Sequence, residues 1–281
     1  MDTSLLWPDA TFVIFDSETT GKYPLEAQLC ELAAIKWEKG EVVDEFQSLL
    51  KPSHRIPDEV IAIHHISNEM LVNAPPVQDK INEFHRFVGE AIPVAHHVPF
   101  DLGFIAPEFE RARLPLPNAP VLCTSLLSRA LISEAPNHRL ATLVKHLGLN
   151  GGQAHRALDD SRACLELFMK ILERIGPDAT IEELIGRQGV DLRWRDYSLQ
   201  NLRTSRVMVE IFLAIEEKRA LEIVYQGGSR PGQARTVLPM GIVRNHQGDF
   251  LVAREETEAS PKKLEEVPKR YFLTKITAAR S

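Results

Sequence analysis

The spacing of apolar residues predicts a series of strands and helices from residue 11 to about residue 176. Thr11–Asp16 is an apolar run typical of a strand buried on both faces. Val77–Val88 and Ala157–Ile175 carry apolar residues at helical spacing. The other predicted strands are Gln28–Trp37, Val42–Leu50, Pro93–His96 and Val121–Cys123. The other predicted helices are Pro57–His65, Phe100–Arg113, a helix ending near Leu131, and Arg139–Leu147.

A different pattern follows residue 176. Gly176-Pro177 ends the last long helix, and Thr180 with Glu183 forms a capping box for a short one. We interpret residues 177–205 as a linker or adaptor helix between a domain at 1–176 and a second domain at 206–281. The second domain is predicted to contain several short strands, typical of a small β-barrel or compact sheet. Its predicted elements are the helix Val207–Lys218, the strands Leu221–Tyr225, Thr236–Pro239, Gly241–Arg244, Asp249–Ala253 and Arg270–Thr277, and a charged loop, Glu255–Pro268.

Composition narrows the class of protein. The 281 residues are 44% apolar, enough for two cores, and the net charge of −6 is not typical of a nucleic-acid binder. Residues 206–281 carry +3 and the remainder −9, so the two parts are expected to have different roles. Cys30, Cys123 and Cys164 show no CxxC spacing and are predicted to be core thiols. Without a signal peptide or a spanning apolar run, we expect a cytoplasmic protein with no membrane partner.

Two acids mark the end of the first strand. In extended backbone, residues two apart project to the same side, so Asp16 and Glu18 emerge together. Alone they would repel one another, whereas a hard divalent cation would bind both. The alternative interpretation is a strand that ends in an ordinary polar turn.

Further acids appear downstream at similar positions. Asp101 lies at a predicted junction of strand and helix, and Asp160 lies in the first turn of a helix, five residues after His155. Four carboxylates fit two divalent cations about 4 Å apart, and histidine is suited to take a proton from water. The alternative for Asp159 and Asp160 is a pair of acids that simply favour a helix N-terminus.

Three stretches in this order resemble the motifs of the DnaQ-like, or DEDDh, 3′–5′ exonucleases. They are Asp16-Ser-Glu18-Thr-Thr-Gly21, Ala95-His96-His97-Val-Pro-Phe100-Asp101, and His155-Arg-Ala157-Leu-Asp159-Asp160. The resemblance covers residues 12–165. It implies an RNase H-like mixed sheet flanked by helices. It also implies two Mg²⁺ or Mn²⁺ ions held by Asp16, Glu18, Asp101 and Asp160, with His155 as the general base.

The same resemblance implies contacts to the substrate. Thr19 and Thr20 would contact the terminal nucleotide, and Phe100 belongs to the second motif. His64 lies in a stretch similar to the family's His-Gly-Ile-Thr, and His96 begins the second motif. His65 replaces the usual Gly, and His97 the usual Asn. The alternative for His64 and His96 is a pair of packed, hydrogen-bonded histidines.

The C-terminal part resembles a WYL domain, which implies an Sm-like or SH3-like barrel that senses ligands or binds single-stranded nucleic acid. The resemblance rests on the stretches 214–225, 235–241, 248–253 and 270–276, with Asp249-Phe250-Leu251 in place of the signature tripeptide. Arginine near aromatic residues suits base stacking and phosphate contact. The alternative is that the aromatic residues are core and the arginines a solvated face. The candidates are Tyr225, Arg235, Arg244, Phe250, Arg254 and Arg270.

These observations predict a metal-dependent 3′–5′ exonuclease that acts on single-stranded DNA or RNA with a free 3′ end. The alternative is a sensor protein that uses the nuclease fold as a binding platform. DNA and RNA remain open as substrates, and so do proofreading, DNA repair, RNA trimming and defence as roles. The WYL ligand and the oligomeric state also remain open, a homodimer included.

Overall fold

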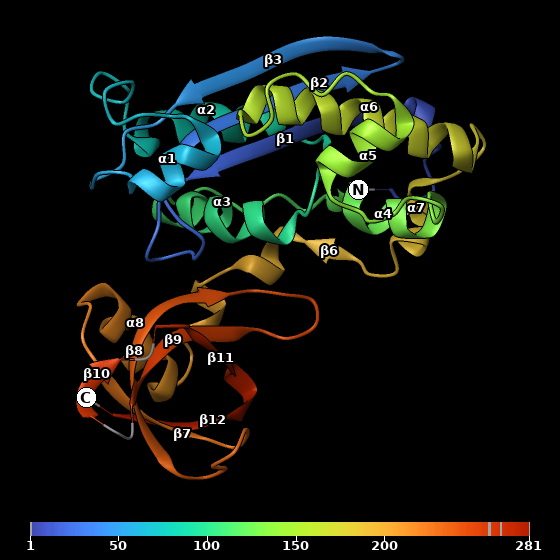
Figure 1. Ribbon diagram of the computed structural model, residues 1–281. Helices are drawn as coiled ribbons and strands as arrows, with labels where there is room; N and C mark the ends of the chain where they lie inside the picture. Colours follow the sequence, from blue (N-terminus) through green and yellow to red (C-terminus); the bar gives the residue numbers. More distant parts are fainter. Residues whose placement is uncertain (1, 258–259, 265, 281) are drawn as a thin grey trace. The chain divides into compact units, whose positions relative to one another are not determined.

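The chain folds into two compact units in a computed structural model that describes residues 2–257, 260–264 and 266–280 (Figure 1). The first unit comprises Met1–Thr20 and Leu29–Asp196. The second comprises Gly21–Gln28 and Tyr197–Ser281. Each unit has its own cluster of buried apolar side chains.

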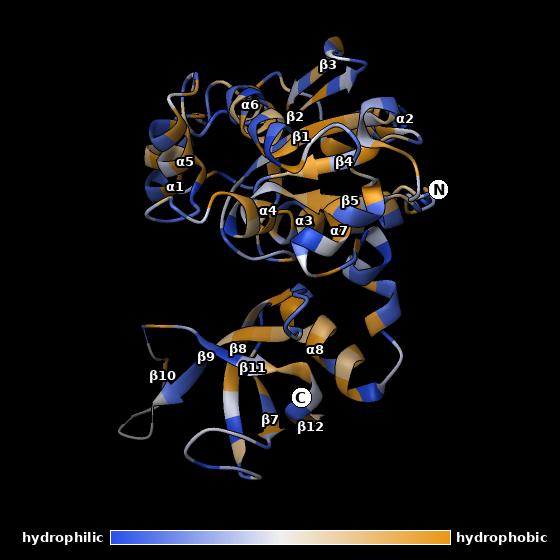
Figure 2. Cartoon of the chain, turned by 90° about the vertical axis from the view of Figure 1, so that its right-hand side faces the viewer, coloured by the Kyte–Doolittle hydropathy of each residue, from blue (hydrophilic) through white to orange (hydrophobic). Residues whose placement is uncertain are grey.

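A six-stranded mixed sheet forms the centre of the first unit, in the order β3-β2-β1-β4-β5-β6. The first three strands form an antiparallel meander, whereas β1, β4 and β5 run parallel and β6 antiparallel. Figure 2 shows β1, β4 and β5 as predominantly apolar strands. The strands are β1 (Thr11–Thr19), β2 (Leu29–Glu38), β3 (Glu41–Leu49), β4 (Ile92–Ala95), β5 (Pro120–Cys123) and β6 (Leu192–Arg193).

Helices cover this sheet, which confirms the predicted α/β class. The long helix α6 lies against β1 and β2 (Figure 1), and α4 and α5 pack against α6. On this face of β1, Phe12 contacts Phe168 of α6, with ring centroids 5.0 Å apart. On the other face, Phe15 packs against Trp194 at 6.1 Å. The helices are α1 (Asp58–His64), α2 (Val77–Val88), α3 (Pro99–Arg111), α4 (Thr124–Leu131), α5 (Leu140–Leu147), α6 (Ala157–Ile175) and α7 (Ile181–Gln188).

The segment predicted as a linker or adaptor contributes to both units. The capping box is present: Glu183 N–H donates to Thr180 Oγ1, and Glu183 Oε2 accepts from Thr180 N–H. Residues up to Asp196 belong to the first unit, where β6 pairs with β5 and Trp194 is buried. The remaining residues, 197–205, belong to the second unit.

The second unit is an antiparallel sheet in the order β10-β9-β8-β7-β12, with β11 paired to β9. Closure of this sheet into an Sm-like or SH3-like barrel stays a prediction. The two strands predicted on either side of Met240 form one strand, β8, with an irregularity between Pro239 and Gly241. The elements are α8 (Arg206–Glu216), β7 (Leu221–Tyr225), β8 (Ala234–Val243), β9 (Phe250–Thr257), β10 (Ser260–Leu264), β11 (Lys269–Phe272) and β12 (Ile276–Arg280).

The predicted charged loop Glu255–Pro268 is wrong, because β9 continues to Thr257 and β10 follows it. Glu255 explains the difference. Its side chain is 2% exposed, and it accepts hydrogen bonds from Arg230, Lys269 and Tyr271. A charged residue that is paired in this way can occupy the buried face of a strand.

The loop between β1 and β2, Gly21–Gln28, belongs to the second unit. Leu25 packs against the core of that unit. The carbonyl oxygen of Pro24 lies so close to Gly241 that a Cβ atom at position 241 would be 2.5 Å from it. Glycine is therefore required at this position. The segment that follows the first pair of acids is therefore held by the C-terminal unit.

Two predictions from composition concern thiols and membranes. Cys30, Cys123 and Cys164 are free and buried, as predicted for core thiols. None of the helices in the described part of the chain is long and apolar enough to cross a bilayer.

Candidate active site

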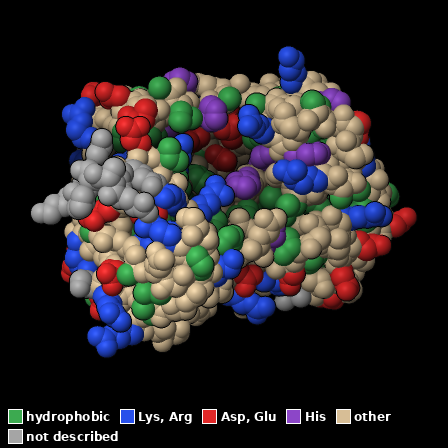
Figure 3. Space-filling model, turned by 60° about the horizontal axis from the view of Figure 1, so that its bottom comes forward, with side chains coloured by type: hydrophobic (Ala, Val, Ile, Leu, Met, Phe, Trp, Pro, Cys, Tyr) green, Lys and Arg blue, Asp and Glu red, His purple; other side chains and the backbone are tan. Residues whose placement is uncertain are grey.

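The four predicted acids come from three elements of the first unit. Asp16 and Glu18 lie on β1, which extends to Thr19, and alternation places both on the face that Phe12 directs toward α6. Asp160 lies in the first turn of α6 and Asp101 in the first turn of α3. Figure 3 shows acidic side chains within a recess, with histidines nearby.

One group of these side chains has the geometry of a metal site. Ligand atoms of Glu18, His155 and Asp160 all lie within 4.8 Å of one another. The backbone N–H of His155 donates to Asp160 Oδ2 at 2.8 Å, which fixes the loop before α6 to its first turn. The neighbouring acid, Asp159, instead accepts from the N–H of Gln153 at 3.0 Å. Of the two adjacent acids, Asp160 is the one in this group.

The electrostatics of the acids show mutual repulsion in a buried setting. Burial, together with the charges of Asp101, Glu18 and Asp160, raises the pKa of Asp16 well above its usual value. Burial and the neighbouring acids raise the pKa of Glu18 to about 8. Burial also raises the pKa of Asp101 to about 7, although its hydrogen bond from Ser17 opposes the shift. Folding therefore brings these carboxylates so close together that a bound cation is required for neighbouring groups to be ionised at the same time.

A divalent cation fits this donor set. Carboxylate oxygens are the preferred ligands of hard cations such as Mg²⁺ and Mn²⁺, and the group found among the described residues contains no thiolate that would favour a softer metal. Asp16, Glu18, Asp101 and Asp160 are the residues that would hold it.

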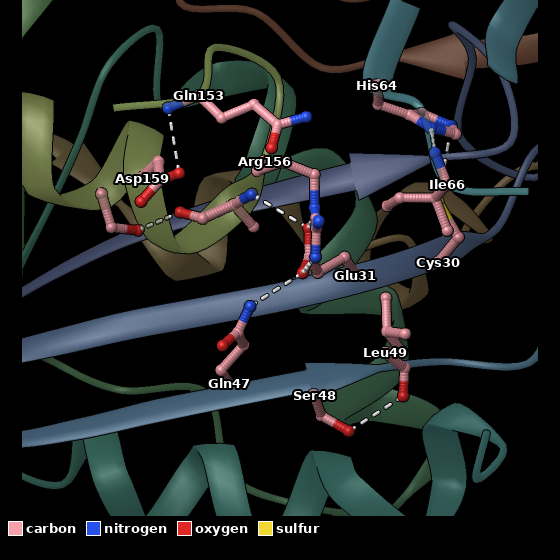
Figure 4. Close-up of polar contacts among 12 residues, drawn as sticks. Cys30, Glu31, Gln47, Ser48, Leu49, His64, Ile66, Gln153, Arg156 and Asp159 are labelled. Carbon is pink, nitrogen blue, oxygen red and sulfur yellow. Dashed lines mark hydrogen bonds and ion pairs between the residues drawn. The ribbon is translucent and has the colours of Figure 1, made fainter. Parts of the chain in front are cut away.

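Glu31 is a site residue that the sequence did not indicate. It is fully buried on β2 and receives four hydrogen bonds (Figure 4). Arg156 donates twice, through Nε at 3.1 Å and Nη2 at 2.8 Å; the N–H of Ala157 and the Nε2 of Gln47 each donate at 3.0 Å. Burial alone would raise the pKa of Glu31, but these bonds hold it below its usual value. Glu31 thus anchors the two residues that follow His155.

The predicted substrate-contacting residues lie around the acids. Thr19 and Thr20 are buried at the end of β1, and Thr20 Oγ1 lies 3.0 Å from His54 Nε2. His64 is 1% exposed, and its Nδ1 accepts from the N–H of Ile66 at 3.0 Å. Phe100 is half-buried and packs against Phe104.

His96 makes contacts on both ring nitrogens. Its Nε2 lies 3.0 Å from the carbonyl oxygen of His138, and its Nδ1 lies 2.9 Å from Thr124 Oγ1. Burial lowers the pKa of His96 to about 4, so the ring is neutral near pH 7. Because a carbonyl oxygen accepts only, Nε2 carries the proton and Nδ1 accepts from the threonine. A role of His96 in substrate binding stays a prediction.

The two histidines that depart from the motif pattern share one backbone feature. His65 has φ of 61° and His97 has φ of 66°, both in the left-handed region. Gly and Asn, the usual residues at these positions, are the ones that enter this region at least cost. The backbone at 65 and 97 therefore has the shape for which the usual residues are suited.

The WYL candidates differ in their exposure. Tyr225 and Phe250 are 7% and 8% exposed, and Arg235 is buried near Tyr225, with its Cζ atom 5.8 Å from the ring centroid. Arg244 pairs with Asp249, whereas Arg254 is exposed.

The remaining candidate, Arg270, lies at an exposed aromatic surface. Its Cζ atom is 5.0 Å from the ring centroid of Phe250. The sequence did not single out Phe272, which is 40% exposed, contacts Phe250 edge to face, and has Lys275 Nζ 5.8 Å from its ring centroid. The sequence feature that could have indicated Phe272 is the alternation of side chains along β11, where Tyr271 is buried and Phe272 is exposed.

Comparison with known families agrees with this geometry. The exonuclease family model matches residues 13–168, more than half of the chain, and the WYL domain model matches residues 206–265. The chain therefore belongs to the exonuclease family, the hydrolases that cleave terminal phosphodiester bonds. The predicted resemblance to DEDDh exonucleases with a C-terminal WYL domain is confirmed.

The relatives include much longer proteins. The chain is 41% identical over 165 residues to the PolC-type DNA polymerase III of Oceanobacillus iheyensis, and 38% identical over 167 residues to that of Staphylococcus aureus. Each alignment covers 59% of this chain and 12% of the relative, so the chain matches a small part of those polymerases.

Solved structures show the same fold. Exonuclease X in complex with 5′ overhanging duplex DNA superposes with a TM-score of 0.50 and 27% identity, covering 63% of this chain and 99% of that chain. The nuclease domain of 3′hExo, a DEDDh family member bound to rAMP, superposes with a TM-score of 0.52 and 18% identity. The superposition covers 63% of this chain and 98% of that chain. These likenesses show the exonuclease fold over 63% of the chain.

Proposed function

We propose that this protein is a divalent-metal-dependent 3′–5′ exonuclease that removes nucleotides from the 3′ end of single-stranded DNA or RNA. The observation that carries the proposal is the convergence of Glu18 on β1 with Asp160 and His155 at the start of α6. Asp16 lies on the same face of β1 as Glu18, and its pKa is raised by burial and by the charges of neighbouring acids, Glu18 and Asp160 among them. Solved structures with the same fold include Exonuclease X in complex with 5′ overhanging duplex DNA, and a 3′-exonuclease that recognises the 3′ end of a histone mRNA stem-loop. Both kinds of nucleic acid are therefore candidate substrates.

The chain's own residues divide the chemistry between them. Asp16, Glu18, Asp101 and Asp160 would hold two Mg²⁺ or Mn²⁺ ions, which when bound offset the charge of the phosphodiester and activate a water molecule. A ring nitrogen of His155 accepts the proton of the attacking water. Thr19 and Thr20 position the terminal nucleotide at the end of β1, beside the acids.

The polarity of digestion tests this proposal directly. A single strand labelled at its 5′ end should shorten stepwise from the 3′ end in Mg²⁺ or Mn²⁺, whereas EDTA should stop the reaction. Asp16→Ala should lower the rate at least about a hundredfold, because it removes a ligand from the charged centre. Full activity in Asp16→Ala, or shortening from the 5′ end, would contradict the proposal.

The alternative function, a sensor that uses the nuclease fold as a platform, makes a different prediction. A platform need not bind cations at the acid group. Calorimetric titration with Mn²⁺ separates the two: an exonuclease binds the metal, and Asp16→Ala weakens that binding.

For the second unit we propose a small Sm-like or SH3-like fold that captures single-stranded nucleic acid and presents its 3′ end. Phe272, Phe250 and Arg270 support this. The exposed ring of Phe272 contacts Phe250 edge to face, and the guanidinium of Arg270 lies over the Phe250 ring; an exposed ring and a nearby guanidinium are suited to base stacking and phosphate contact. The other candidates, Tyr225, Arg235, Arg244 and Arg254, would then shape or flank this surface. A regulatory ligand at the same unit is the competing role.

Substitution of the exposed ring tests the role of the second unit. Phe272→Ala should weaken binding of a single-stranded oligonucleotide roughly tenfold and leave the single-turnover rate unchanged, since one base loses its stacking partner. Phe272→Tyr, which keeps a ring, should bind like the wild type. Unchanged affinity in Phe272→Ala would favour the regulatory ligand. Point variants are preferable to truncation, because Gly21–Gln28 depends on this unit.

A further inference from the structure

A cavity of about 550 Å³ opens beside the second motif of the first unit. Its walls come from the end of β4, from α4, and from the segment that leads into α5. They include His96, His97, Arg129, His138 and Arg139, and no acidic residue is among the described residues that line it. The cavity is therefore basic, in a unit whose net charge is negative.

Sheet register places this cavity next to the acids. Ile14 of β1 pairs with Val94 of β4 in parallel, so the position after β4, His96, lies level with Asp16. Ala95 pairs with Cys123 of β5, which brings Thr124 level with His96. Neighbouring strands lie about 5 Å apart, so the cavity begins roughly 5–10 Å from Asp16 along the same edge of the sheet.

Two guanidinium groups at the cavity are unpaired. Arg129 and Arg139 are exposed, and neither side chain has an ion pair or hydrogen bond within the described ranges of the chain. Arg111 and Arg174 in the same unit pair with Glu108 and Glu134. Two free fork-shaped donors facing one cavity are suited to phosphate oxygens.

Hydrogen bonds fix the walls of the cavity. His96 joins the end of β4 to the carbonyl of His138 and to Thr124 at the start of α4. Ser128 of α4 lies 3.0 Å from Nδ1 of His138, which holds the histidine ring. The segment that carries Arg139 is thus tied to the sheet, and a bound phosphate would pay little ordering cost.

We propose that this cavity is a subsite for the phosphodiester backbone of the substrate strand upstream of its 3′ end, with Arg129 and Arg139 contacting successive phosphates. The inference rests on the proposed function, because a strand whose terminal nucleotide lies at the acids must continue past the ends of neighbouring strands. A polyanion leaving a negatively charged site requires compensating cations on its path. The cavity supplies them at the adjacent strand ends.

Binding measurements test the subsite independently of hydrolysis. Arg129→Gln with Arg139→Gln should weaken binding of a single-stranded oligonucleotide in EDTA roughly tenfold, because two charge-assisted contacts are lost. The slope of log affinity against log salt should fall by about 0.7 for each contact. Arg86→Gln, an exposed arginine on α2, is the matched control and should bind like the wild type. Unchanged affinity and slope in the double variant would overturn the proposal.

Hydrolysis separates the subsite from the catalytic centre. The p-nitrophenyl ester of thymidine 5′-phosphate has no upstream phosphodiester, so the double variant should cleave it at the wild-type rate to within about twofold. On an oligonucleotide the same variant should lose kcat/KM through a higher KM. Equal losses on both substrates would mean that the arginines support the fold or the centre rather than the strand. A wild-type protein inactive on both substrates would contradict the proposed function, and the binding assay would still decide the subsite.

Discussion

Three histidines near the acids have a backbone conformation that few side chains adopt. His65, His97 and His155 have φ between 61° and 66°. A residue with a Cβ atom in this region costs roughly 1–2 kcal/mol relative to glycine. At His155 the conformation accompanies the bond from its N–H to Asp160, so local strain is linked to the position of a proposed base.

Replacement of His65 with glycine should stabilise the first unit. The side chain of His65 is exposed and ends α1 in the left-handed conformation, so glycine keeps the shape without the steric cost. We expect a gain of about 1 kcal/mol in the free energy of unfolding, measured with urea. His146→Gly, in the last turn of α5, is the control and should lose up to about 0.5–1 kcal/mol, because glycine loses more conformational freedom there. A loss in His65→Gly would show that the imidazole contributes a contact that outweighs the strain.

The sequence predicted which residues belong to the candidate site better than it predicted the contacts between them. The spacing of Asp16, Glu18, His155 and Asp160 was readable, because each lies within a short motif. Glu31 was not, because a single acid in a strand shows no sign of its partner, and Arg156 is 125 residues away. Phe272 was missed because its exposure depends on which face of β11 is buried.

The anchoring of α6 to β2 is the main contact between elements at the site. Glu31 of β2 binds Arg156 and the N–H of Ala157, the residues at the start of α6. The position of His155 and Asp160 therefore depends on a buried carboxylate on a neighbouring strand.

Glu31→Gln should lower both stability and activity. It leaves the Arg156 guanidinium, which is 24% exposed, without its counter-charge, and we expect a loss of about 3 kcal/mol in the free energy of unfolding. Adding Arg156→Met should recover part of this loss, because the unpaired charge is removed. A double-mutant cycle by urea denaturation measures the coupling. Additive losses would contradict the anchoring role.

The bounds of helices with a regular spacing of apolar residues were predicted to the residue. The bounds of a strand rich in charged residues were not. Val77–Val88 and Ala157–Ile175 match α2 and α6 exactly in extent, because their apolar faces pack on the sheet and on neighbouring helices. The strand β9 was read partly as a loop, because Glu255 and its neighbours suggest solvent exposure. Only the tertiary structure supplies the cations that allow Glu255 to be buried.

For the whole molecule, the acid group makes stability depend on pH and metal. The pKa of Glu18 is raised to about 8 and that of Asp101 to about 7, above their unfolded values near 4. Such groups stabilise the fold below pH 4, and this contribution is lost as pH rises through 7–8. We expect the free energy of unfolding of the metal-free protein to fall by at least about 2 kcal/mol between pH 5 and pH 8. Thermal unfolding in EDTA measures this change.

Mn²⁺ should reverse this loss. Bound cations favour the ionised carboxylates, so the rise in melting temperature on adding metal should be larger at pH 8 than at pH 5. Asp101→Asn, which removes one of the ionising groups, should flatten the pH dependence in EDTA. A metal-free protein equally stable at both pH values would contradict the account of the acid group.

The division into two units was predictable in outline and not in detail. The break in pattern after residue 176 and the two resemblances indicated two parts of different character. The placement of Gly21–Gln28 with the C-terminal unit was not predictable, because it depends on the close approach of Pro24 to Gly241. No local signal in the sequence records that contact.

Under the proposed function, the four acids and His155 carry out hydrolysis of the phosphodiester bond at the 3′ end of a nucleic-acid strand. The most direct test compares Asp160→Asn with Asp159→Asn on a 5′-labelled single strand in Mn²⁺. Both variants change one adjacent acid in the same turn of α6, but Asp160 alone belongs to the group with Glu18 and His155. We expect Asp160→Asn to lose at least about a hundredfold in rate, whereas Asp159→Asn should stay near the wild type. Equal rates in the two variants, or loss confined to Asp159→Asn, would contradict it.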